Sequence, residues 1–117
     1  MTSQSVDGPV LAAISNELVG LHARFYGRGP TKARTLMAED VVVCSLREPF
    51  TRAEQTLIEL GRRAEVEAAR SAFGVEMRAQ LTAVVERLTG RRVIAFICEI
   101  HVDPDMAVHV FFLAPDS

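Results

Sequence analysis

Apolar side chains recur at intervals of three and four residues near the start of the chain, which is the spacing of one helix face. Pro9 suits a first helical turn, and Gly27 suits the end of a helix because glycine tolerates a positive backbone φ. The apolar positions between them are Leu11, Ile14, Leu18, Leu21 and Phe25. The pattern predicts a first helix over about residues 9–26.

A second helix is predicted from its two ends. Thr51 and Glu54 have the spacing of a capping box, in which a hydroxyl accepts from the third helical amide and the carboxylate reaches back. The helix is therefore expected to begin at Arg52. Its last part has an apolar face, and Gly90 follows at the place of a C-terminal cap. The apolar residues of that face are Met77, Leu81, Val84, Val85 and Leu88.

Two glycines interrupt this long helical stretch. Gly61 and Gly74 each cost about 1 kcal/mol relative to alanine inside a helix, so one or both are expected to kink or break it. Charged residues of alternating sign lie between them, and such a run is typical of a solvated helix face or of the rim of an interface. These residues are Arg62, Arg63, Glu65, Glu67 and Arg70. Arg62 and Arg63 are candidates for an interaction surface.

Two pairs of β-favouring runs predict two hairpins. The first hairpin pairs residues 35–38 with 41–46 across a Glu-Asp turn. The second pairs residues 92–102 with 106–113 across an Asp-Pro-Asp segment, in which the proline cannot donate to a ladder. The order helix, hairpin, long or broken helix, hairpin predicts an α+β domain with a four-stranded, mainly antiparallel sheet and helices on one face.

The run over residues 92–102 is apolar on both faces of its strand. Alternate positions from Ile94 to Val102 are apolar, and so are Val93, Ala95 and Ile97 between them. If helices cover one face, a second copy of the chain is the simplest cover for the other, and a homodimer through sheet or helix surfaces is expected. The alternative is a monomer whose long helix bends round both faces of the sheet.

Composition narrows the class of protein. The chain has 117 residues, of which 49% are apolar and 24% charged, as in a globular domain rather than a disordered or fibrous chain. One domain over residues 9–117 is expected after a loose terminus over residues 1–8. A net charge of -2 argues against nucleic acid as a partner. Cys44 and Cys98 lie in apolar runs and are expected to be buried thiols rather than a disulfide.

The hydropathy of the chain also bears on its location. No apolar run approaches the roughly 18 residues that a membrane span needs. The N-terminal residues lack the charged segment and apolar stretch of a secretory leader. The sequence therefore predicts a cytoplasmic protein with no direct membrane insertion.

Motifs of strong chemical specificity are missing. The sequence has no phosphate-binding loop, dinucleotide fingerprint, Cys-x-x-Cys pair or His-Glu-x-x-His helix, so we expect neither an enzyme nor a bound cofactor. The turn from Gly27 to Pro30, with Arg28, Lys32 and Arg34, is a candidate anion site, because backbone amides and cationic side chains can converge there on a carboxylate or phosphate. The alternative is a plain helix-to-strand turn with solvated basic residues.

A second constellation lies in the last hairpin. If a three-residue loop joins its strands, Glu99 pairs opposite His109 with His101 diagonal to it, all on one face. Two histidines and a carboxylate suit a metal ion or a pH-sensitive pair. The alternative is a set of ordinary edge or interface residues, and a shift of the register by one residue would dissolve the cluster.

Five segments in a fixed order carry a resemblance to a known family. They are the helix ISNELVGLHARFY from Ile14, the turn GRGP from Gly27, EDVVV from Glu39, TRAE from Thr51 and ERLTGRRVI from Glu86. Over about residues 10–114 the chain resembles the MpsC-like proteins, a small bacterial family associated with Na+-translocating, membrane-potential-generating systems. The resemblance implies an accessory component of a membrane system that moves Na+ or inorganic carbon, and it implies no catalytic residues.

Three functional hypotheses follow. The first is a homodimeric interaction module that docks on a partner such as a membrane transporter subunit, through its arginine-rich helix or a sheet edge. The second is an anion or small-molecule sensor that uses the segment from Gly27 to Arg34. The third is a metal enzyme built on Glu99, His101 and His109.

Overall fold

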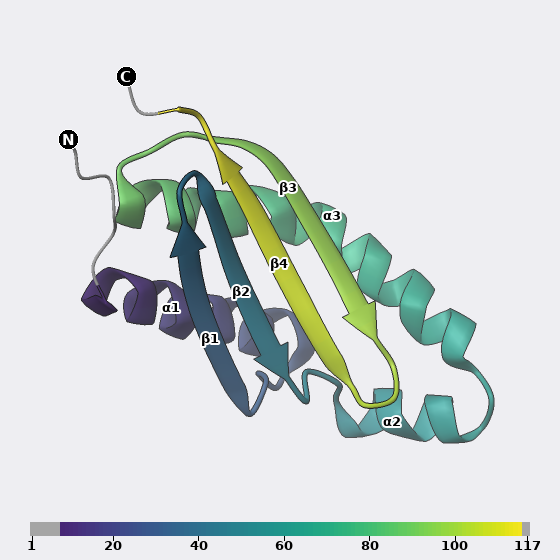
Figure 1. The fold of residues 1–117 in the computed structure, drawn as a ribbon. Coiled ribbons are helices and arrows are strands. Elements are labelled where there is room, and N and C mark those ends of the chain that lie inside the picture. Colours follow the sequence, from purple (N-terminus) through teal and green to yellow (C-terminus); the bar gives the residue numbers. More distant parts are fainter. Residues whose placement is uncertain (1–7, 116–117) are drawn as a thin grey trace.

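Helices alternate with two hairpins along residues 8–115, the part of the chain that the computed structural model describes (Figure 1). The first half contains α1 (Gly8–Tyr26), β1 (Lys32–Ala38) and β2 (Val41–Arg47). The second half contains α2 (Arg52–Glu59), α3 (Arg63–Thr89), β3 (Val93–His101) and β4 (Met106–Leu113). The predicted α+β arrangement is therefore confirmed.

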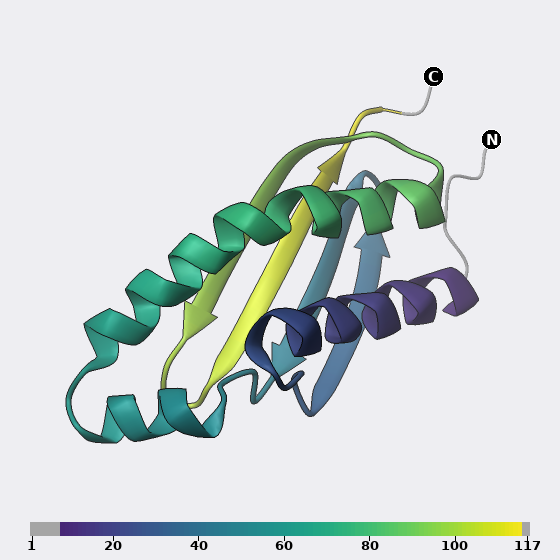
Figure 2. The ribbon, with the colours of Figure 1, turned by 180° about the vertical axis from the view of Figure 1, so that it is seen from behind.

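All four strands form one sheet in the order β1-β2-β4-β3, and every neighbouring pair is antiparallel. Figure 2 shows α1 and α3 side by side on one face of this sheet, while Figure 1 shows the opposite face without a helix over it. The predicted placement of the helices on one face is confirmed. The alternative of a long helix bending round both faces is wrong.

The ends of the elements depend on local chemistry that the sequence already displays. The capping box at the start of α2 forms, because the Glu54 amide donates to Thr51 Oγ1 at 3.1 Å and the Thr51 amide donates to Glu54 Oε1 at 2.8 Å. Gly90 ends α3 in the left-handed conformation, with φ of 71°. The expected loose terminus lies outside the described residues except for Gly8, which begins α1.

The two glycines of the long helical stretch behave differently. Gly61 separates α2 from α3 and has φ of 80°, a value that favours glycine. Gly74 lies inside α3 and does not interrupt it. The stretch is therefore broken once, at the first glycine.

The inner face of the sheet and the two long helices enclose the main core. Along β2 and β4, buried residues alternate with half-buried ones, as a sheet covered on one face requires. Buried side chains from the sheet include Val42, Cys44, Leu46, Phe111 and Leu113. The helices contribute Ile14, Leu18, Leu21, Met77, Leu81 and Val85. A smaller cluster of Phe50, Val66 and Val102 lies beside α2.

The opposite surface of the sheet, which we call the outer face, is also apolar. Leu36 is 53% exposed and Ile97 is 49% exposed, although both lie within strands. The centre of the outer face is formed by Leu36, Val41, Val43, Ile97, Val108, Val110 and Phe112. A contiguous apolar surface of this kind on a protein is characteristic of an interaction site.

The contrast between the two glycines gives a test of the helical break. Gly74→Ala should raise the free energy of unfolding by about 1 kcal/mol, because an added Cβ meets no atom within 4 Å and alanine favours the helix. Gly61→Ala should lower it by about 1 kcal/mol, because alanine is strained at positive φ. Urea unfolding followed by circular dichroism measures both, and shifts of the same sign would contradict the assignment.

Candidate functional site

A guanidinium from the first third of α3 is buried where four segments meet. The Arg70 side chain is only 4% exposed and forms a paired contact with Glu54, with its Nε 2.7 Å and its Nη2 2.6 Å from the two carboxylate oxygens. Nη2 also donates to the Pro49 carbonyl at 2.7 Å, and the guanidinium carbon lies 3.6 Å from the centroid of the Tyr26 ring. The cation is therefore neutralised, hydrogen-bonded and stacked at once.

Glu54 is held by two sets of donors. Its own burial opposes ionisation, but the hydrogen bonds from Arg70 and Thr51 and the charge of Arg70 outweigh burial, so the pKa of Glu54 is lowered. The same carboxylate that caps α2 thus neutralises the cation on α3. The start of α2 and the first third of α3 are tied through a single side chain.

A pair of buried histidines lies beside this ion pair. His22 Nε2 and His109 Nε2 are 2.9 Å apart, and the two residues are 3% and 2% exposed. Burial first, and the Arg70 charge second, lower the pKa of His22 to about 4. Burial, followed by the charges of His22 and Arg70, lowers the pKa of His109 to about 3. Both rings are neutral near pH 7, so one Nε2–H donates to the other ring's bare Nε2.

The neutral histidine pair leaves hydrogen-bonding capacity unused. Neither His22 Nδ1 nor His109 Nδ1 has a partner among the described residues, although both atoms are buried. A ring whose Nε2 accepts must carry its proton on Nδ1, so the pair presents one unsatisfied donor and one unsatisfied acceptor. A cavity of about 30 Å³ adjoins both rings and also borders Tyr26, Arg70 and Cys98. That volume is large enough for a water molecule.

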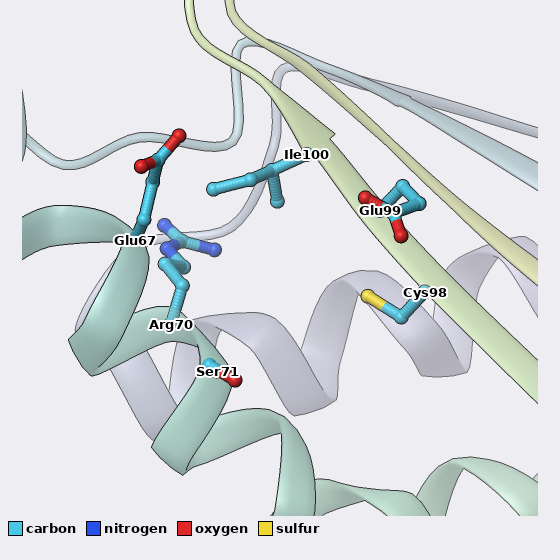
Figure 3. A pocket seen from close by; sticks show the side chains of 6 residues that line it. All are labelled: Glu67, Arg70, Ser71, Cys98, Glu99 and Ile100. Carbon is cyan, nitrogen blue, oxygen red and sulfur yellow. The ribbon is translucent and has the colours of Figure 1, made fainter. Parts of the chain in front are cut away.

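A wider groove opens above this cavity between α3 and the edge strand β3 (Figure 3). It has a volume of about 290 Å³ and is lined by Glu67, Arg70, Ser71, Cys98, Glu99 and Ile100. Cys98, unlike Cys44, is exposed rather than buried as predicted, and its thiol points into the groove. Desolvation by the surrounding atoms, followed by the charge of Glu99, raises the pKa of this thiol to about 11, so it stays protonated near pH 7. The groove thus offers hydrogen-bonding groups and an apolar wall, while its guanidinium is paired with Glu54.

The cluster predicted in the last hairpin does not form. The strands are joined by a four-residue loop rather than a three-residue one, so Cys98 pairs with His109 and Glu99 pairs with Val108. His109 consequently lies in the core, whereas Glu99 and His101 are exposed. Within residues 8–115, no three histidine, cysteine or acidic side chains are grouped as a metal ion would require. The predicted register is wrong by one residue.

The basic residues of the predicted anion site lie on two segments, the turn after α1 and the strand β1. Arg28 donates through Nη1 to the carbonyl oxygens of Glu48 and Phe50, which joins the end of α1 to the segment before α2. Lys32 and Arg34 lie on exposed positions of the edge strand β1. Anion binding by these three residues stays a prediction.

The other predicted surface lies at the start of α3. Arg62 pairs with Glu65, and Arg63 pairs with Glu67 at 3.2 Å. Both arginine side chains are more than half exposed, as the charge pattern indicated. Arg70, predicted to lie on the same solvated face, is buried instead. Its spacing of four residues from buried Val66 and seven from buried Met77 is the signal that places it on the inner stripe.

The histidine pair predicts a particular loss of stability in mild acid. Each folded-state pKa lies below the ordinary value of 6.5, so the unfolded chain binds more protons and stability falls as pH decreases below 6.5. Each histidine contributes up to about 1.4 kcal/mol per pH unit. Urea unfolding at pH 7 and pH 5 should show this loss for the natural chain, and His22→Leu/His109→Leu should flatten it. The exposed-residue control His101→Gln should retain it, and an unchanged slope in the double variant would contradict the assignment.

Comparison with known proteins identifies the family of the chain. No curated protein and no solved structure shows significant similarity to the chain. None of the described helices combines the length and apolar character of a membrane span. The family model described as "Na+-translocating membrane potential-generating system (MpsC)" matches residues 7–115, which is nearly the whole chain. The resemblance drawn from the sequence is confirmed, and the chain belongs to the MpsC family.

Proposed function

We propose that this chain is a non-enzymatic, cytoplasmic accessory subunit of a Na+-translocating membrane system and that it acts as a homodimer. Family membership supports the association with such a system. The apolar outer face of the sheet is the observation that carries the proposal for an interaction protein, because no element of residues 8–115 covers it (Figure 1). A surface of this composition is stabilised when another apolar surface removes it from water.

A second copy of the chain is the cover we propose. Sheets pack face to face at about 10 Å, and apolar side chains from the two faces then interdigitate. A symmetric dimer needs one surface that is complementary to itself, and a flat apolar sheet meets that requirement. In this arrangement the helical layers of the two copies lie on the outside of the dimer.

The helical side then remains open to a partner subunit. Arg62 and Arg63 are exposed at the start of α3. The Phe96 carbonyl of the edge strand β3 accepts from Arg78 Nη2 at 3.1 Å, so the backbone at this position points away from β4. An exposed basic helix end suits contact with an acidic segment of another protein, and an edge strand suits contact with an extended one.

The oligomeric state tests the proposed interface. Val110→Asp puts a carboxylate at the centre of the outer face and should convert a dimer into a monomer of 12.8 kDa, because an unpaired charge cannot be buried there. Val75→Asp, at a position on α3 that is 75% exposed, should leave the dimer intact. Sedimentation velocity measures both masses. A monomeric natural chain at micromolar concentration, or a dimer that survives Val110→Asp, would overturn the proposal.

Recovery of a membrane partner tests the accessory role. Arg62→Glu/Arg63→Glu should reduce by several-fold the yield of a polytopic subunit that co-purifies with the tagged chain from mildly solubilised host cells. The matched control Arg87→Glu/Arg92→Glu reverses two arginines at the other end of α3 and should leave the yield unchanged. Exposed ion pairs contribute little to folding, so both variants should fold. Equal recovery of the membrane subunit with the natural chain and with both variants would count against this surface.

A further inference from the structure

The antiparallel register arranges the outer face in rows that cross all four strands. Residues paired between β1 and β2, β2 and β4, and β4 and β3 lie at the same height along the strands. The two apolar rows are Leu36, Val43, Val110 and Ile97, followed by Ala38, Val41, Phe112 and Ala95. The next row toward the other end is Arg34, Ser45, Val108 and Glu99, and the last is Lys32, Arg47, Met106 and His101.

One row carries opposite charges at its two ends. Arg34 lies on β1 and Glu99 on β3, which are the two edge strands of the sheet. Three strand spacings separate them, or about 14 Å, so they cannot form an ion pair within one copy. Among residues 8–115, neither side chain takes part in an ion pair. The cation and the anion are both exposed on the rim of the apolar surface.

A two-fold axis parallel to the strands would bring these charges together. Rotation about that axis keeps each row at its own height and exchanges the left and right edges of the sheet, so β1 of one copy lies over β3 of the other. Arg34 of each copy then faces Glu99 of its partner, which gives two symmetric pairs. Long side chains from both faces reach across the roughly 10 Å between packed sheets. In the same arrangement, each apolar row of one copy faces the identical row of the other copy.

An axis that crosses the strands gives a poorer match. It places β1 over β1 and β3 over β3, and it reverses the order of the rows. Arg34 and Glu99 then face apolar rows of the partner, or, if the axis passes through their own row, Arg34 faces Arg34 and Glu99 faces Glu99. If the axis lies between the two apolar rows, the charged row extends past the apolar rows of the partner and forms no pair. A charge against an apolar surface loses solvation, and like charges repel. Charge therefore favours the axis along the strands.

We propose that two copies pack their outer faces about a two-fold axis parallel to the strands, with Arg34 of each copy paired with Glu99 of the other. This inference rests on the proposed homodimer and adds its orientation. The apolar rows supply the attraction, and the charged row at their border fixes which edge lies over which. Arg34, a candidate ligand for a small anion, then binds a carboxylate of the partner.

Charge reversal distinguishes the two orientations. Arg34→Glu turns two attractions per dimer into two repulsions and should raise the dimer dissociation constant about 10- to 100-fold at low salt. Glu99→Arg should do the same. The double variant Arg34→Glu/Glu99→Arg should return to within about threefold of the natural chain, because both pairs form again with exchanged signs. Fluorescence-detected sedimentation measures the constants.

Mixing the two single variants gives a second readout. A heterodimer of Arg34→Glu with Glu99→Arg has an opposite charge in both pairs, so native mass spectrometry of the mixture should show more heterodimer than either homodimer. The control Arg47→Glu/Glu99→Arg has the same net charge as the double variant, but Arg47 lies on the inner strand β2, so it should not recover affinity.

The results separate the orientation from the dimer itself. If Val110→Asp dissociates the dimer but the single charge reversals leave its dissociation constant unchanged, the outer face is the interface and the proposed orientation is wrong. If the Arg47 control recovers affinity as well as the Arg34 double variant does, net charge rather than pairing is responsible, and the orientation is again overturned. A monomeric natural chain overturns the dimer and the orientation together.

Discussion

The contact between Arg70 and Glu54 is the interaction on which the lower half of the fold depends. It joins α3 to the first turn of α2, and through the Pro49 carbonyl and the Tyr26 ring it also reaches the preceding loop and the end of α1. A buried guanidinium is tolerated only when its charge and its donors are satisfied, so all these segments must stay in place together. α2 has no fully buried residue of its own, so this contact acts together with the packing of half-buried Leu57 and Ile58 to hold α2 in place.

The same cation influences the core above it. Its charge adds to burial in lowering the pKa of both His22 and His109, so the two rings are neutral and can share one hydrogen bond. Ionisable groups at the centre of the inner face are thereby engaged in contacts within the chain: an ion pair and a histidine pair. On the outer face, Arg34 and Glu99 take part in no ion pair among residues 8–115, and the apolar rows face away from the helices. Within the described residues, the inner face is therefore covered by other parts of the same chain, and the apolar rows of the outer face are not.

Local signals in the sequence predict most of the fold, and long-range contacts decide the rest. The capping box at Thr51 and the glycine cap at Gly90 involve neighbours within a few residues, so their spacing alone predicts them. The burial of Arg70 depends on a carboxylate 16 residues away and on a ring from α1, which a helical charge pattern does not reveal. His22 shows a similar limit. It lies four residues after Leu18 on the buried stripe, but its partner is 87 residues distant.

A single residue of loop length decides what the last hairpin presents on each face. A three-residue loop would have put His109 and Glu99 opposite each other; the four-residue loop shifts the pairing, so that His109 faces the helices while Glu99 stays exposed. Because side chains alternate along a strand, this one shift also sets which residues share a row across the sheet. It places Glu99 level with Arg34, at opposite edges of the outer face. The register that dissolves a metal-like cluster within one copy thus creates the row of opposite charges on which the proposed orientation of two copies rests.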